Sequence, residues 1–389
     1  MTKTLFLMTG LAVGSLAEAS EKTGADARDG DKAADIEIHG YIAPQFQAVW
    51  RPDARPVDQS RVGMTKSVAG LIFDGEVSPA WGFKIHFVLG AETFEALTAA
   101  SPVDRDNDGT TDAVYTETEP AISDMVVESS VYYQPADFFR LQVGRMRIPF
   151  TSQAQSPNTA LMFPERSGPN QAFIKGSDMG VLAKTDLLEQ RIQASIGVFN
   201  GTSTNVLKTD QQGVLYTARI DINPLGAFGF SETSEWAGPF LLGVGSGLIY
   251  NPYTAYDNAG YATVAVKDTR HSLSGRMSFY GLYVVGEFLS RQQLDSMTSR
   301  PVWGQGWYGQ AGWHLPLGFE PMFRMGESTI DESFDPQTTQ WLDLGLNYYP
   351  AVKAKRMDQV KITVHYLSEN RVDENERAQG ISTRVQVTW

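Results

Sequence analysis

The chain has 389 residues, of which 42% are hydrophobic and 20% charged, and its formal net charge is −13. This acidic balance disfavours a nucleic-acid partner, which would need a basic surface. The sequence holds no cysteine, which excludes disulfides and thiolate metal sites. The length suits either two ordinary domains or one large barrel.

The first residues have the three parts of a secretory signal. Lys3 supplies a positive start, Leu5 to Leu16 an apolar stretch, and Ala17-Glu18-Ala19 a cleavage site. We therefore expect a signal peptide over residues 1–19 and a disordered, polar periplasmic leader over residues 20–35. A short buried helix is the alternative. No later run reaches about 18 apolar residues, which argues against an α-helical inner-membrane protein.

From Ile36 onward, apolar and polar side chains alternate with a period of two, which is typical of strands with two different faces. The segment from Ile36 to Arg51 is longer than the usual globular strand. The count comes to about sixteen strands, and bacterial outer-membrane barrels have an even number. We predict strands at residues 36–51, 69–77, 83–89, 125–133, 138–146, 178–184, 192–199, 215–223, 241–250, 272–279, 282–291, 306–315, 319–325, 341–349, 360–366 and 381–389.

The connections between these strands alternate between short turns and long polar loops, as periplasmic turns and extracellular loops do. With both termini in the periplasm, this alternation holds throughout. One connection, from Asn223 to Pro239, is longer than a periplasmic turn should be. The long connections span residues 92–121, 150–175, 201–213, 251–267, 292–305, 327–339 and 369–379.

The last strand, from Ile381 to Trp389, has one wholly apolar face and ends on an aromatic residue. A closing barrel strand must face lipid on one side and water on the other. A soluble β-sandwich is the alternative, but it would place charges outside and a dry core inside. We predict an all-β, transmembrane antiparallel β-barrel over residues 36–389, in the bacterial outer membrane. Its lipid and, through the strand ending at Trp389, the barrel-assembly machinery would be partners.

Several segments resemble a known family. Gly-Arg-Met-Arg-Ile-Pro-Phe at residues 144–150, followed by Phe-Pro-Glu-Arg-Ser at residues 163–167, resembles the strand and constriction-loop motif of the phosphate-selective porin O/P family. Residues 81–84, 319–324, 344–350 and 384–387 are also similar to that family, so the resemblance covers most of the mature chain. It implies a trimeric outer-membrane channel of about sixteen strands, whose third extracellular loop folds into the lumen.

The connection from Phe150 to Lys175 is the best candidate for the pore constriction, because a loop bent into a tube sets the field and diameter at one place. Its expected charges are Arg147, Glu165, Arg166 and Lys175. Glu165 and Arg166 could instead fix the loop to the wall, and both roles can hold. Arg145 and Arg147 have the parity of lipid-facing residues, so either a bulge at Gly144 turns them inward or this stretch lies above the lipid or in a subunit interface.

The inward faces of the strands carry charges of both signs, so anion selectivity does not follow from them. We expect a channel for passive diffusion of small hydrophilic solutes and ions, with anions such as phosphate as one candidate class. An outer-membrane lipid hydrolase and a secreted β-rich binding protein are the alternatives. The expected pore-lining residues are Lys84, Arg219, Arg276, Arg324, Asp343, Lys361 and Arg384.

A second motif lies in the connection before residue 121. Asp104, Asp106, Asp108 and Asp112, with Gly109, match positions of a calcium-binding loop. The twelfth position is Tyr115 instead of the bidentate Glu, and an acidic, solvated loop tip is the alternative reading. A bound Ca²⁺ would be structural, and no cofactor is required. None of the five histidines lies in a metal or nucleophile motif, so we expect a protein that is not an enzyme.

Overall fold

The computed structural model describes residues 35–52, 60–89, 126–201, 213–234, 236–256, 262–295, 301–332, 335–350 and 359–389, and the account below concerns these ranges. The expected signal peptide, the leader up to residue 34 and the candidate calcium loop at Asp104–Asp112 lie outside them. Among the described residues, no helix is long and apolar enough to cross a membrane.

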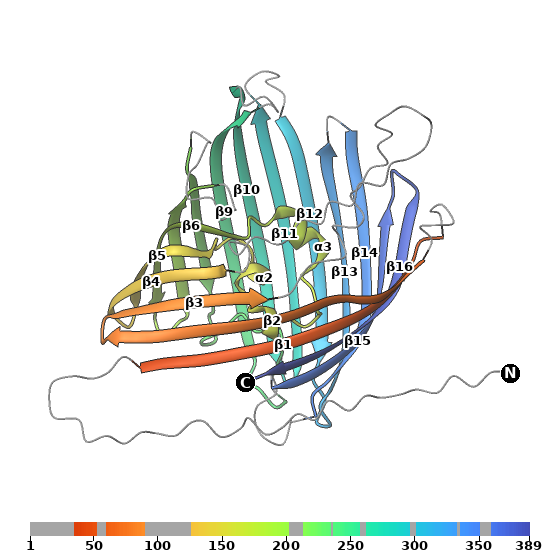
Figure 1. The fold of residues 1–389 in the computed structure, drawn as a ribbon, viewed down its shortest axis with the longest axis horizontal. Helices are drawn as coiled ribbons and strands as arrows, with labels where there is room; N and C mark the ends of the chain where they lie inside the picture. The colour runs from red at the N-terminus through yellow and green to blue at the C-terminus, as the bar shows by residue number, and fades with distance from the viewer. Residues whose placement is uncertain are drawn as a thin grey trace. The chain divides into compact units, whose positions relative to one another are not determined.

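Sixteen strands, each paired antiparallel with its neighbours, form a closed ring that is completed by β16 beside β1 (Figure 1). The predicted barrel is confirmed, and each predicted segment overlaps one strand. The first eight strands are β1 (Asp35–Trp50), β2 (Ser60–Ser78), β3 (Trp81–Leu89), β4 (Val126–Ala136), β5 (Phe139–Arg147), β6 (Ser177–Leu187), β7 (Ile192–Phe199) and β8 (Leu215–Ile222). The other eight are β9 (Leu241–Tyr256), β10 (Ala262–Phe279), β11 (Leu282–Asp295), β12 (Pro301–Trp313), β13 (Phe319–Glu332), β14 (Asp335–Tyr348), β15 (Val360–Arg371) and β16 (Glu376–Thr388).

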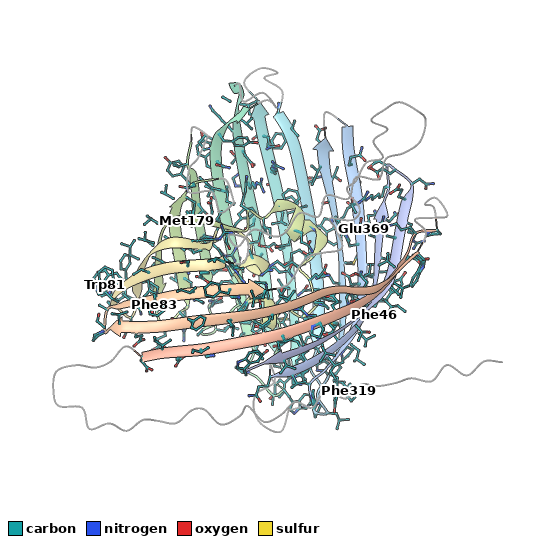
Figure 2. All side chains as sticks on the ribbon, in the orientation of Figure 1. Phe46, Trp81, Phe83, Met179, Phe319 and Glu369 are labelled. Carbon is teal, nitrogen blue, oxygen red and sulfur yellow. The ribbon has the colours of Figure 1, made fainter. Side chains whose placement is uncertain are left out.

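The outer surface of the barrel is apolar and its inner face is polar. In β14, Leu342, Leu344 and Leu346 are exposed, whereas Asp343 and Asn347 between them are buried. Figure 2 labels Phe46 and other aromatic side chains among those drawn on the strands. This distribution suits a tube with hydrocarbon outside, because a charged side chain at the middle of a bilayer costs about 2–4 kcal/mol.

The spacing of two exposed tryptophans on one strand can be compared with the thickness of a membrane. On β12, Trp303 and Trp313 lie on the same outward face, ten residue steps apart. At about 3.4 Å per residue and a tilt of about 40°, they are separated by about 26 Å along the barrel axis. A transmembrane barrel has an apolar band of about 25 Å between two aromatic girdles, so this spacing fits one membrane crossing.

We call the end of the barrel where β1 begins and β16 stops the terminal end, and the opposite end the far end. Toward the far end the strands extend further than predicted. The connection expected at residues 327–339 is mostly strand, because β13 continues to Glu332 and β14 begins at Asp335. Outside the lipid neither face of a strand needs to be apolar, so the period-two hydrophobic pattern fades there although the hydrogen-bonded ladder continues.

The barrel closes at Gly40 and Trp389. Their backbones exchange two hydrogen bonds, of 3.0 Å and 2.9 Å. The indole of Trp389 lies over Gly40, and a Cβ added at Gly40 would fall 2.3 Å from a ring carbon. On β16, Ile381 and Val385 are exposed and Arg384 is buried, as the two-faced closing strand predicts. The aromatic terminus thus fills the gap that a glycine leaves on the outer surface.

Candidate functional site: the pore constriction

The connection between β5 and β6, residues 148–176, is called loop 3 here. It contains two short helices, α2 (Ser152–Gln155) and α3 (Gly168–Phe173), and the 3₁₀ turn η2 (Asn158–Ala160). The Thr151 and Ser167 side chains cap the two helices by accepting from backbone N–H groups, as residues of this type do. These caps give an irregular segment a defined local shape.

Apolar side chains fix both ends of loop 3 to the barrel. Ile148 and Phe150 after β5, and Phe173 at the end of α3, are buried in one cluster with side chains of β5, β6, β7, β8, β9 and β11. Burying one such side chain stabilises its position by about 1.5–3 kcal/mol. The two ends of the loop are therefore held by packing, while its middle depends on polar contacts.

Basic side chains of strands far along the ring donate hydrogen bonds to the backbone carbonyls of loop 3. Arg219 of β8 donates to Phe150 O at 2.6 Å. Lys361 of β15 donates to Leu161 O at 2.7 Å. Buried carbonyls without helix or sheet partners need such donors, since leaving a polar group unpaired costs about 1–3 kcal/mol. The same kind of contact joins Arg270 to Phe173 O, Arg324 to Glu165 O and Arg384 to Pro164 O.

Glycines on the inner face of β9 make room for these contacts. A Cβ at Gly247 would lie 2.1 Å from the carbonyl oxygen of Phe150. A Cβ at Gly245 would lie 2.2 Å from Oδ1 of Asp221, which pairs with Arg219 at 2.6 Å. Loop 3 and this ion pair thus approach the β9 backbone more closely than any side chain would permit.

Arg147 and Arg166, two of the predicted constriction charges, meet at one backbone carbonyl. Each donates to Ser156 O at 2.9 Å. Gly144 has a φ of +131°, and Arg147, three residues later, contacts loop 3. Arg166 also donates to Asn158 Oδ1 and Gln153 O. Burial, followed by the charge of Arg147, lowers the pKa of Arg166 to about 10, so it remains charged at neutral pH.

Lys175 and Glu165, the other two predicted constriction charges, lie apart from that carbonyl. Lys175 Nζ is 3.8 Å from a carboxylate oxygen of Asp268 on β10. Burial, and then the charge of Arg270, lowers the pKa of Lys175 to about 8, although Asp268 opposes the shift. The backbone carbonyl of Glu165 accepts from Arg324. The four predicted charges are therefore distributed from the end of β5 along loop 3 instead of forming one cluster.

The predicted lining residues have two kinds of surroundings. Arg219, Arg276, Arg324, Lys361 and Arg384 are all buried against backbone carbonyls. Asp343 is also buried, and it accepts from Arg324 at 2.7 Å. Lys84 is different, because it is only partly buried and pairs with Glu128 at 3.8 Å.

The sequence pattern did not reveal the group formed by the buried Asp268 and Arg270 and the partly exposed Arg291. Asp268 accepts from Arg270 at 2.7 Å and lies 3.3 Å from Arg291. The expected connection ended at residue 267 and the predicted strand began at residue 272, so Asp268 and Arg270 were assigned to neither. Ser272 faces inward, and the residues two and four positions earlier in a strand face the same way. Extending the predicted strand back from residue 272 would therefore have found both Arg270 and Asp268.

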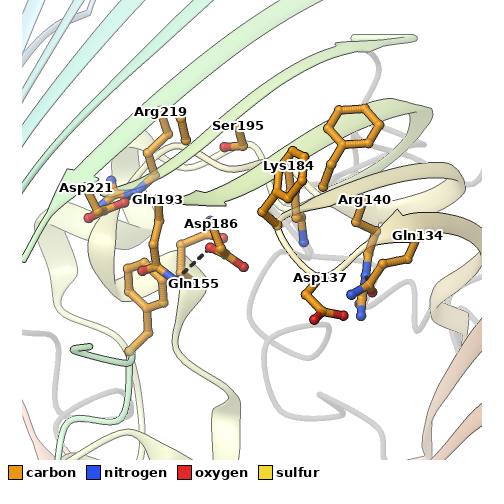
Figure 3. Close-up of a pocket in the computed structure, with 14 residues that line it drawn as sticks. Gln134, Asp137, Arg140, Gln155, Lys184, Asp186, Gln193, Ser195, Arg219 and Asp221 are labelled. Atoms are coloured by element: carbon orange, nitrogen blue, oxygen red, sulfur yellow. Dashed lines mark hydrogen bonds and ion pairs between the residues drawn. The ribbon is translucent and has the colours of Figure 1, made fainter. Parts of the chain in front are cut away.

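A cavity of about 370 Å³ lies between loop 3 and the inner faces of β4 to β8, near the terminal end of the barrel. Arg140, Lys184, Asp186 and the Arg219–Asp221 pair line its wall, and Asp137 comes from the turn before β5 (Figure 3). Phe230 comes from the connection after β8. Among the described residues, neither Arg140 nor Lys184 has an ion-pair partner within 4.0 Å. Arg140 does donate to Gln134 Oε1 at 2.8 Å and lies 4.3 Å from the centre of the Tyr132 ring. This side of the barrel thus combines open space with cations that no described carboxylate pairs with.

Within the ranges that the structure describes, no three potential metal ligands lie close enough to hold an ion. No protein-family model matches the chain, and no curated protein matches it either. Solved structures do resemble it, at sequence identities that establish the fold alone.

An anion-selective porin from Comamonas acidovorans is 11% identical with a TM-score of 0.60, covering 92% of this chain and all of that one. The trimer form of OmpT, an outer-membrane protein of Vibrio cholerae, is 10% identical with a TM-score of 0.56 and the same coverage. The outer-membrane channel DcaP of Acinetobacter baumannii is 12% identical with a TM-score of 0.55, covering 92% of this chain and 97% of that one. The chain thus shares its fold with these bacterial outer-membrane barrels.

Proposed function

We propose that this protein is a porin, through which small hydrophilic solutes and ions diffuse passively across the outer membrane. Loop 3 would form its constriction. The observation that carries this proposal is the set of hydrogen bonds from β8, β10, β13, β15 and β16 to loop 3, together with the cavity left beside β4 to β8. A loop held against one part of the inner face narrows a tube without closing it.

The same contacts suggest which charges a passing ion meets. Arg219 and Lys361 are occupied by loop carbonyls, so they serve mainly to position loop 3. Arg140 and Lys184 line the cavity together with Asp137 and Asp186. We propose a passage on the β4 to β8 side with charges of both signs and modest ion selectivity.

Phosphate or another small anion remains a narrower candidate. The resemblance of residues 144–150 and 163–167 to the phosphate-selective porin O/P family favours it, as does the anion-selective structural neighbour. The lining carboxylates Asp137 and Asp186 oppose it. The general porin proposal does not depend on this choice.

Planar-bilayer recording of the purified protein tests both the general porin proposal and the narrower phosphate proposal. Stepwise conductance is expected, and protein that is inserted but never conducts would contradict the porin proposal. The reversal potential under a KCl gradient then gives the sign of selectivity, and added phosphate shows whether it competes. A cation-selective channel without phosphate block would discard the phosphate version alone.

We also propose that the barrel has no catalytic role. The described partners of three buried histidines support this: His86 contacts the hydroxyl of Tyr41, His314 the carbonyl oxygen of Ser234, and His365 packs on Phe163. None of these contacts aligns a serine hydroxyl for attack. Lipase activity in purified protein that depends on one serine would refute this proposal.

Two proposals concern binding partners. A homotrimer is supported by the likeness to the trimer form of OmpT, and crosslinking in native membranes tests it. A structural Ca²⁺ at Asp104–Asp112 rests on the spacing of its carboxylates. Calcium titration of the folded protein and of its Asp108→Asn variant tests this site, and equal binding by the two would refute it.

A further inference from the structure

The connection between β8 and β9, residues 223–240, is called the inner turn here. At the same end of the barrel, β2 and β3 are joined by two residues, as are β4 and β5 and also β10 and β11. Among the described part of the inner turn, Phe228, Glu232 and Ser234 are buried. A long turn with buried residues must pack against something, since exposed turns are mostly polar and solvated.

The inner turn packs against the inner face of β10 and the start of β11. Arg276 of β10 donates to Gly229 O at 2.6 Å and lies 4.4 Å from the centre of the Phe230 ring. The rings of Phe228 and Tyr283 meet edge to face, with centroids 6.1 Å apart. The turn is therefore fixed to the wall independently of loop 3.

The inner turn also contacts loop 3, which comes from the far end. The backbone N–H of Glu232 donates to Ala160 O at 2.9 Å. The Glu232 carboxylate accepts from Met162 N through Oε2 and from Gln153 Nε2 through Oε1, each at 2.9 Å. The hydroxyl of Ser156 donates to Phe230 O at 2.6 Å. Two segments that start at opposite ends of the barrel thus meet at one buried carboxylate.

We propose that the inner turn is a second structural element of the constriction and that Glu232 positions the middle of loop 3 in addition to the cations of the wall. The wall holds the inner turn through Arg276, and the inner turn holds the middle of loop 3 through Glu232. Together they confine the passage to the side of β4 to β8, where Phe230 of the inner turn forms part of the cavity wall. This inference deepens the proposed porin function and rests on it for its conductance readout.

Replacing the carboxylate by an amide tests the role of Glu232. In Glu232→Gln, the amide NH₂ faces a donor, either Met162 N or Gln153 Nε2. Hydrogen bonds to a charged acceptor are among the stronger ones, so the ratio of held to released loop 3 should fall about tenfold or more. The native chain holds no cysteine, so a single Met162→Cys replacement gives a unique reporter at a fully buried position. A hydrophilic thiol reagent should label it about tenfold faster in the Glu232→Gln background.

An exchange variant separates positioning from mere disruption. Adding Gln153→Glu to Glu232→Gln restores the contacts between the two residues: the new amide at 232 donates to the new carboxylate at 153, while Met162 N and Ser167 N keep their acceptors. The 3.4 Å hydrogen bond from Gln153 Nε2 to Gln310 Oε1 is lost, but the Gln310 amide, whose Nε2 has no partner among the described residues, can turn to donate to the new carboxylate. Labelling should return to the wild-type rate. The matched control is Glu189→Gln, in the exposed turn between β6 and β7, which should leave the rate unchanged.

Conductance gives the second readout. The Glu232→Gln channel should show a larger and noisier conductance than the wild type, and the exchange variant should not. An unchanged labelling rate in Glu232→Gln overturns the proposal, and so does an exchange variant that labels as fast as Glu232→Gln. If the wild-type protein inserts but does not conduct, the porin proposal fails, whereas the labelling rates still decide whether Glu232 holds loop 3.

Discussion

Arg324 on β13 offers the sharpest test of the idea that strand cations hold loop 3. Its Nε donates to Asp343 Oδ2 at 2.7 Å, and its NH1 donates to Glu165 O at 2.7 Å. Its guanidinium also lies 4.3 Å from the centre of the Phe163 ring in loop 3. One side chain thus has one partner on the wall and two on the loop.

The two kinds of partner predict different energies for Arg324→Met. Leaving Asp343 buried without its partner should destabilise the barrel by about 3–5 kcal/mol. The contacts to loop 3 are worth about 1.5–3 kcal/mol for the charged hydrogen bond and up to about 2 kcal/mol for the cation–π contact. Adding Asp343→Leu removes the unpaired charge, so most of the barrel stability should return while loop 3 remains weakly held.

Two assays separate these effects. Denaturant unfolding in detergent reports barrel stability, and single-channel recording reports loop 3. Arg324→Met should lower the free energy of unfolding of the barrel and make the single-channel conductance more variable. Arg324→Met with Asp343→Leu should recover stability but keep an enlarged, fluctuating conductance. The exposed Arg377 of β16 supplies the control, since Arg377→Met should change neither. A double variant with wild-type conductance would refute the anchoring role.

Three further predictions concern charge, pH and closure. Lys184→Gln should shift the reversal potential toward cations, because the lysine has no ion-pair partner among the described residues and lines the cavity; an unchanged potential would contradict a passage on that side. The pKa of Lys175 is lowered to about 8, so its ammonium is charged below that pH and neutral above it. The ratio of anion to cation permeability should therefore fall between pH 7 and 9, and Lys175→Gln, measured at both pH values, should not show this change. Gly40→Val should slow refolding and lower thermal stability because its side chain would meet the Trp389 ring, whereas Gly275→Val, with no atom within 4 Å of its added Cβ, should be tolerated.

The barrel could be predicted because lipid imposes a strict rule on one face of each strand. Strand β7 was predicted at residues 192–199, and the structure gives Ile192–Phe199. The prediction was weakest where that rule ends. In β13 and β14, Thr329 and Thr338 face each other with hydroxyls 3.1 Å apart, in a stretch predicted to be loop. Polar cross-strand pairs of this kind leave no hydrophobic period to read.

The inward parity of the charges was also predictable, but their partners were not. Parity placed Lys361 and Arg384 inside, where they are buried. Their acceptors are carbonyls of Leu161 and Pro164, about 200 residues away in sequence. Every residue has a backbone carbonyl, so sequence carries no mark that identifies the one that a given lysine or arginine will meet.

This difference affects how the charge of the channel should be counted. A cation that donates to a carbonyl at 2.6 Å, as Arg219 does, and pairs with Asp221 contributes little field to a passing ion, because its donors and its charge are both occupied. Lys184 lines the same cavity as Arg219 but forms no ion pair within 4.0 Å among the described residues. A census of inward residues therefore overestimates the charge available to solutes wherever an irregular loop lies against the wall. Ion selectivity should change when charged residues of β5 and β6 are substituted. It should change little when Arg219 of β8 or Lys361 of β15 is replaced by an uncharged side chain that still donates a hydrogen bond to loop 3.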